Sequence, residues 1–78
     1  MIINSVVFVG GCREVENSSI LLENQDCKLF RFYFANKEDI RTVDLNVLTK
    51  IEGYVDVQEF PFPIIMVEKV YQLNNNVN

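Results

Sequence analysis

Apolar side chains recur at every second position through most of this chain, and this spacing constrains the fold more than any other feature. The clearest case is the range 28–36, in which three phenylalanines alternate with Leu29, Arg31, Tyr33 and Ala35. A period of two places alternate side chains on opposite faces of a strand. We therefore expect a strand whose core face carries the phenylalanines and whose outer face carries Arg31 and Tyr33. The three phenylalanines are Phe30, Phe32 and Phe34.

Further ranges with β-branched or alternating apolar residues also predict strands. The first, Ile3–Val9, is apolar on both faces and is expected to end at Gly10-Gly11, with a polar loop over Cys12–Asn17 after it. The remaining strand ranges are Ser19–Glu23, Arg41–Leu48, Lys50–Gln58 and Ile64–Leu73.

The range 38–50 fits two interpretations. Ile40, Val43, Val47 and Ile51 recur at spacings of three and four, as in a helix. We favour a strand over Arg41–Leu48, because β-branched residues prefer strands and the polar residues of this range alternate with them. This strand would then form a hairpin with the range 28–36.

These patterns predict an all-β fold with little or no helix, arranged as a small five-stranded barrel or a meander. Closure into a barrel would also protect the edges of so apolar a sheet. A chain of 78 residues has room for one domain. We expect that domain to span residues 1–73, followed by a frayed polar tail over Asn74–Asn78.

Composition argues against several classes of protein. No apolar run approaches the ~20 residues of a membrane span, and no basic stretch precedes the first apolar run, as a secretory signal would require. We therefore expect a cytoplasmic protein without membrane contact. Cys12 and Cys27 would then be reduced thiols.

Catalysis and metal binding are not expected either. The chain has no histidine and two cysteines, too few for a four-ligand zinc site within one chain. No nucleophile lies in a recognisable arrangement with a base, so we expect no enzyme activity, no cofactor and no small-molecule substrate.

Aromatic and basic side chains interleave in the predicted strands, as they do in proteins that stack bases on rings and hold phosphates with cations. The net charge of −4 and the acidic neighbours of Tyr54, Glu52 and Asp56, leave open that the tyrosines are ordinary sheet residues. The segment Phe60-Pro61-Phe62-Pro63 either exposes two rings for binding or folds them back over the core. The candidate nucleic-acid-binding residues are Lys28, Arg31, Tyr33, Arg41, Tyr54, Phe60 and Phe62.

Three segments resemble strands of the bacterial single-stranded-DNA-binding proteins and their primosomal relatives. Ile3–Gly10 is similar to the opening strand of that family, Ile51–Val55 to its Val-x-Val-Glu-Gly-x-Leu strand, and Ile65–Leu73 to its closing strand. The resemblance implies an OB-fold that binds single strands across one face and with its loops, in DNA replication. The helix that usually joins the third and fourth strands of the family has almost no room between Leu48 and Ile51.

We therefore expect a non-catalytic domain that binds single-stranded DNA. The alternative is a protein-interaction or oligomerisation module with the same barrel and no nucleic-acid ligand. In both cases a homo-oligomer, a dimer or a tetramer, is expected through the first strand, because so small a domain buries little area and this strand is apolar on both faces. The resemblance implies assembly through the same region.

Overall fold

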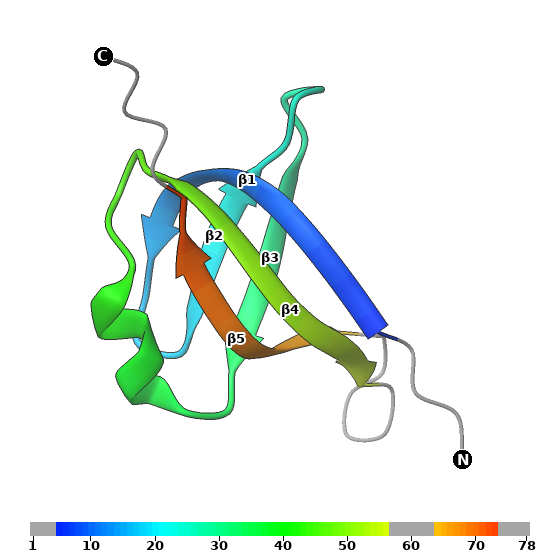
Figure 1. Cartoon of the computed structure of the whole chain (residues 1–78), viewed down its shortest axis with the longest axis vertical. Helices are drawn as coiled ribbons and strands as arrows, with labels where there is room; N and C mark the ends of the chain where they lie inside the picture. The colour runs from blue at the N-terminus through cyan, green and yellow to red at the C-terminus, as the bar shows by residue number, and fades with distance from the viewer. Residues whose placement is uncertain (1–4, 57–63, 74–78) are drawn as a thin grey trace.

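Five strands close into a barrel in the computed structural model, which describes residues 5–56 and 64–73. The strand order is β1-β2-β3-β5-β4, and β4 pairs with β1 to complete the ring (Figure 1). The pairing of β3 with β5 is parallel, and the other four pairings are antiparallel. The prediction of an all-β, OB-like barrel is confirmed. Its elements are β1 (Ser5–Val15), β2 (Ser19–Glu23), β3 (Leu29–Phe34), the 3-10 helix η1 (Lys37–Thr42), β4 (Leu48–Asp56) and β5 (Ile64–Gln72).

The first strand is longer than its sequence indicates. Gly10 and Gly11 lie inside β1, which continues to Val15, so the predicted end at the glycines and the loop over residues 12–17 were wrong. The first half of β1 pairs with β4 and the second half with β2. A Cβ at Gly10 would lie 2.6 Å from the carbonyl oxygen of Glu23 in β2. Glycine at this position therefore permits the close approach of β1 to β2. The curved strand β1 can then pair with β4 along its first half and with β2 along its second half (Figure 1).

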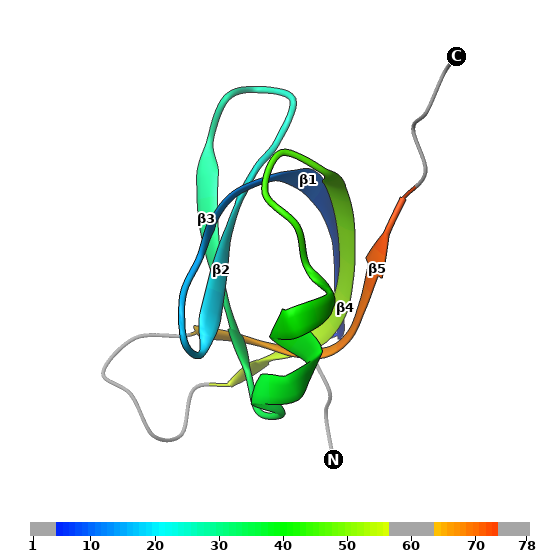
Figure 2. The ribbon, with the colours of Figure 1, turned by 90° about the vertical axis from the view of Figure 1, so that its left-hand side faces the viewer.

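The predicted strand over residues 41–48, and its hairpin with 28–36, were also wrong. Residues 37–42 form η1, which begins where the Asn36 side chain accepts a hydrogen bond of 3.0 Å from the Glu38 N–H. Ile40 and Val43 are buried, whereas Leu45 is 55% exposed. The helical spacing prevailed because it directs these two side chains into the core, with η1 lying in front of the ring of strands in Figure 2.

The β3–β4 connection also provides room for a helix, which the short segment between Leu48 and Ile51 does not. With residues 43–47 outside any strand, the connection between β3 and β4 is long enough to carry η1. Strand β3 pairs instead with β2 and, over Phe32–Phe34, with β5.

The core lies inside the ring and contains two of the three phenylalanines predicted for it. Phe32 and Phe34 are buried, but Phe30 is 37% exposed. Phe30 lies close to the β2–β3 turn, where its ring contacts Phe8 at a centroid distance of 5.0 Å, and Phe8 in turn contacts Phe32 at 4.9 Å. Phe32, Phe8 and Phe30 thus form a series of tilted ring contacts that runs from the core to the surface.

Two further findings bear on the predictions. No helix within residues 5–56 and 64–73 is long and apolar enough to cross a membrane. Phe60, Phe62 and the tail over residues 74–78 lie outside the described residues.

Candidate nucleic-acid interface

Two of the predicted tyrosines are brought into one line by the closure of the barrel. Tyr33 of β3 lies directly opposite Met66 of β5, and Met66 lies directly opposite Tyr54 of β4. Directly paired residues project from the same face of a sheet, and adjacent strands are about 4.8 Å apart. All three side chains are half-buried. We call this line the tyrosine row; it places two rings on the outer face of the barrel with a thioether between them.

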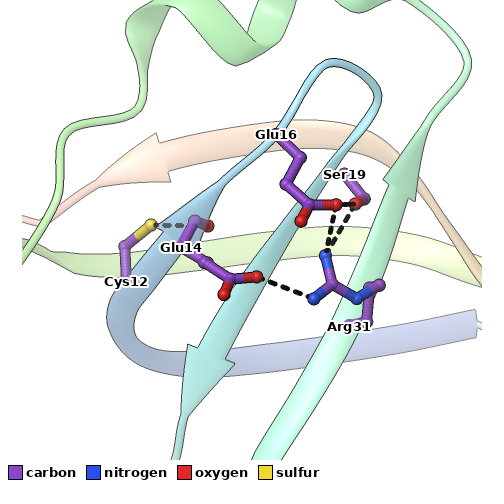
Figure 3. A network of polar contacts seen from close by, with 5 residues as sticks. All are labelled: Cys12, Glu14, Glu16, Ser19 and Arg31. Atoms are coloured by element: carbon purple, nitrogen blue, oxygen red, sulfur yellow. Dashed lines mark hydrogen bonds and ion pairs between the residues drawn. The ribbon is translucent and has the colours of Figure 1, made fainter.

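Arg31, the third predicted residue of this face, already donates hydrogen bonds to other side chains of the chain. It lies two residues before Tyr33 on the same face of β3. Its Nη2 donates to Glu14 Oε1 at 2.8 Å, and its Nη1 donates to Glu16 Oε1 at 3.1 Å and to Ser19 Oγ at 2.9 Å (Figure 3). The hydrogen bond that Arg31 donates to Glu14 raises the pKa of Arg31 above its usual range, so the guanidinium stays charged. We call Arg31, Glu14 and Glu16 the arginine clamp.

A bulge in β1 makes the arginine clamp possible. Cys12 pairs with Leu22 and Glu14 pairs with Leu21, so Arg13 is an extra residue on β1. A bulge of this kind bends a strand and redirects its side chains. Arg13 consequently bonds Glu23 at 2.6 Å, while Glu14 turns toward Arg31. Nothing in the sequence signals this bulge, which is why the carboxylate partners of Arg31 were missed.

Lys28 and Arg41 do not join the tyrosine row. Lys28 precedes β3 and is separated from Tyr33 by five residues, about 16 Å along an extended strand. Arg41 is exposed in the last turn of η1. No hydrogen bond or ion pair within the described ranges connects either side chain to the row.

Beside the row, the outer face of β4 and β5 carries aromatic and basic residues that sequence reasoning missed. Lys50 pairs with Tyr71, and its Nζ lies 5.8 Å from the centre of that ring. Glu52 lies opposite Lys69 and forms a 3.7 Å ion pair with Lys50. The period-two alternation of residues 50–58 does point Lys50 and Glu52 outward, whereas residues 64–73 show no such alternation. Only the β4–β5 register places Lys50 against Tyr71.

The thiols and acidic groups of the described residues are dispersed. Cys12 is fully buried and Cys27 is exposed, and both are free. Burial raises the pKa of the Cys12 thiol. Within the part of the chain that the structure describes, no three Cys, Asp or Glu side chains are grouped so that they could hold a metal ion.

The comparisons with known proteins add no relative. No protein-family model matches the chain, and no curated protein matches it at a significant level.

Proposed function

We propose that this chain binds single-stranded nucleic acid without catalysis, on the outer face of β3, β5 and β4. The observation that carries the proposal is the tyrosine row. Tyr33 and Tyr54 belong to strands that are distant in sequence, and they are aligned across the face of an OB-like barrel with only Met66 between them. Rings on such a sheet stack unpaired bases, and each stacked base contributes about 1–3 kcal/mol. DNA is the expected ligand, from the resemblance of three segments to single-stranded-DNA-binding proteins.

The charges of this face support a binding mode in which stacking outweighs phosphate contacts. Lys69 makes no ion pair with a described residue, whereas Lys50 is paired with Glu52 and Arg31 with two glutamates. Few cations are thus free to neutralise phosphates. The slope of log affinity against log salt concentration is proportional to the number of phosphates that the protein neutralises. We therefore expect the affinity of this chain to depend only weakly on salt.

Binding is tested by fluorescence anisotropy with labelled oligo-dT, with the matching duplex as the comparison. We expect preference for the single strand. Tyr33→Ala and Tyr54→Ala should each weaken binding by about 1–3 kcal/mol. Tyr33→Phe and Tyr54→Phe are the matched controls, because they keep the ring and should retain most of the affinity. No detectable binding at high micromolar protein in low salt would contradict the proposal, as would equal losses in the Phe and Ala variants.

A second candidate function is a protein-interaction module that uses the same barrel without nucleic acid. Two observations favour it. Arg31 is already paired with Glu14 and Glu16, and Val7 and Val9 on β1 are exposed. We also propose that the chain forms a homo-oligomer through this strand. Binding to neither the single strand nor the duplex, together with a stable oligomer, would favour this second candidate.

A further inference from the structure

The arginine clamp occupies the donors that a phosphate beside Tyr33 would use. Arginine binds carboxylates and phosphates with the same fork of N–H groups. In this chain both Nη atoms point to carboxylate oxygens, at 2.8 Å for Glu14 and 3.1 Å for Glu16 (Figure 3). The atoms already bound to Arg31 are therefore anionic acceptor oxygens, as are those of a nucleic-acid backbone.

The two carboxylates are positioned by the end of β1 and by the turn that follows it. Glu14 directly follows the bulged residue Arg13, and the Glu16 N–H donates to the Ser19 carbonyl at 2.8 Å across the β1–β2 turn. The hydroxyl of Ser19, which is buried, donates to Glu16 Oε1 at 3.5 Å and accepts from Arg31 Nη1 at 2.9 Å. The Ser19 hydroxyl thus bridges Arg31 and Glu16 and helps to hold the guanidinium in place.

The clamp is also exposed enough to open. The side chains of Glu14 and Glu16 are 50% and 56% exposed, and that of Arg31 is 31% exposed. Ion pairs this accessible to water are weak, because solvent screens them and both side chains lose freedom when paired. A phosphate could displace either carboxylate without breaking any contact of the core.

We infer that Glu14 and Glu16 are internal competitors of phosphate at Arg31 and set how tightly the tyrosine row holds a nucleic acid. This rests on the proposed function. The two carboxylates keep Arg31 from a bound strand by occupying its donors and by repelling phosphates next to Tyr33. A strand that binds must open the clamp, so affinity is lower than the rings alone would provide.

The test compares Glu14→Gln/Glu16→Gln with Glu38→Gln/Asp44→Asn by oligo-dT anisotropy in low salt. Each variant removes two negative charges. Glu38 and Asp44 are exposed and form no ion pair with a described residue, so they control for net charge. Glutamine keeps the size of glutamate and an acceptor oxygen. We expect the clamp variant to bind on the order of fivefold more tightly than the original chain, and the control to change by less than about twofold. Adding Arg31→Gln to the clamp variant should abolish the gain.

The outcomes separate this inference from the proposed function. If the original chain binds and the clamp variant does not bind more tightly, the inference is overturned and the proposed function stands. An equal gain in both variants, or a gain that survives Arg31→Gln, also overturns it. If only the clamp variant binds, the inference is supported and the function proposed for the original chain fails. Binding by neither overturns both. Thermal unfolding is measured alongside, because a clamp that only ties the turn to β3 would lower Tm without raising affinity.

Discussion

At the scale of single residues, two glycines show how closely the backbones of neighbouring strands approach. Gly53 lies at the irregularity in the β4–β5 pairing, opposite Val67, and a Cβ there would clash with the backbone carbonyl of Met66. At Gly11, by contrast, a Cβ would meet only the Arg13 side chain, at 3.9 Å. Residue type is the same at both sites, but only one of them requires glycine.

Gly53→Ala is therefore expected to lower the free energy of unfolding by about 2 kcal/mol, as for other insertions into packed sites. Gly11→Ala is the matched control and should change it by less than about 0.5 kcal/mol. Urea unfolding followed by circular dichroism measures both. Equal destabilisation by the two substitutions would show that strand propensity, and not the contact with Met66, makes glycine necessary at position 53.

The two thiols should differ in reactivity because one is buried and the other is exposed. Cys12 is fully buried and its pKa is raised by burial, whereas Cys27 is exposed in the β2–β3 turn. Because the thiolate is the reactive form, native protein at neutral pH should be alkylated once, at Cys27, and twice after unfolding. Mass spectrometry of iodoacetamide-treated protein measures this. Rapid native modification of Cys12 would contradict the burial.

The raised pKa of Cys12 also makes the free energy of unfolding depend on pH. The unfolded thiol ionises at a lower pH than the folded one. The contribution of Cys12 to folding is therefore complete below the ordinary thiol pKa, and it is lost as pH rises through the folded-state pKa. Cys12→Ala should reduce this alkaline loss of stability, as measured by unfolding at several pH values, with Cys27→Ala as the control. The same alkaline slope in both variants would contradict this account.

At the scale of elements, η1 is held by its buried side chains more than by its own backbone. It is a short 3-10 helix, a form that is seldom stable alone. Ile40 and Val43 join the core cluster, and Asn36 caps the first turn. The connection between β3 and β4 therefore contributes two buried side chains to the core.

Ile40→Ala should accordingly destabilise the protein by about 2–4 kcal/mol, the usual cost of truncating a buried isoleucine. Leu45→Ala, five residues later and 55% exposed, is the control and should change stability by less than about 0.5 kcal/mol. Thermal or urea unfolding measures both. A small effect of Ile40→Ala would indicate that η1 packs only loosely against the barrel.

At the scale of the whole molecule, the barrel leaves one stretch of strand incompletely covered. Residues 5–10 of β1 pair with β4 along one edge, and no described strand pairs with their other edge. Val7 and Val9 project outward there and are 64% and 42% exposed. An exposed edge with apolar side chains is a surface on which another strand can pair.

A dimer or tetramer in which β1 meets its own copy is the expected result, because symmetric homo-oligomers use the same patch on each subunit. Light scattering at tens of micromolar protein should give a mass above that of one chain. Val7→Lys/Val9→Lys should reduce the mass to that of a monomer with an unchanged circular dichroism spectrum, while Leu45→Lys should not. A monomer mass for the unsubstituted chain would contradict the prediction.

Several elements could be predicted from local pattern alone. The ranges 19–23, 28–36 and 64–73 contain β2, β3 and β5, because their β-branched and aromatic residues are typical of strands. In 28–36 the period-two alternation also placed Phe32 and Phe34 correctly in the core. The range 41–48 could not be resolved in this way. Ile40 and Val43 satisfy a helical spacing and β-branching satisfies a strand, so the available core space decided between them.

An all-β fold, as a small barrel or a meander, and the outward orientation of Tyr33 and Tyr54 could be predicted from the residue pattern. The neighbours of these side chains could not. The tyrosine row depends on the parallel pairing of β3 with β5, and the arginine clamp depends on the bulge at Arg13. Both are contacts between segments far apart in the chain. A local pattern specifies the face on which a side chain lies, but strand register and barrel closure determine its neighbours.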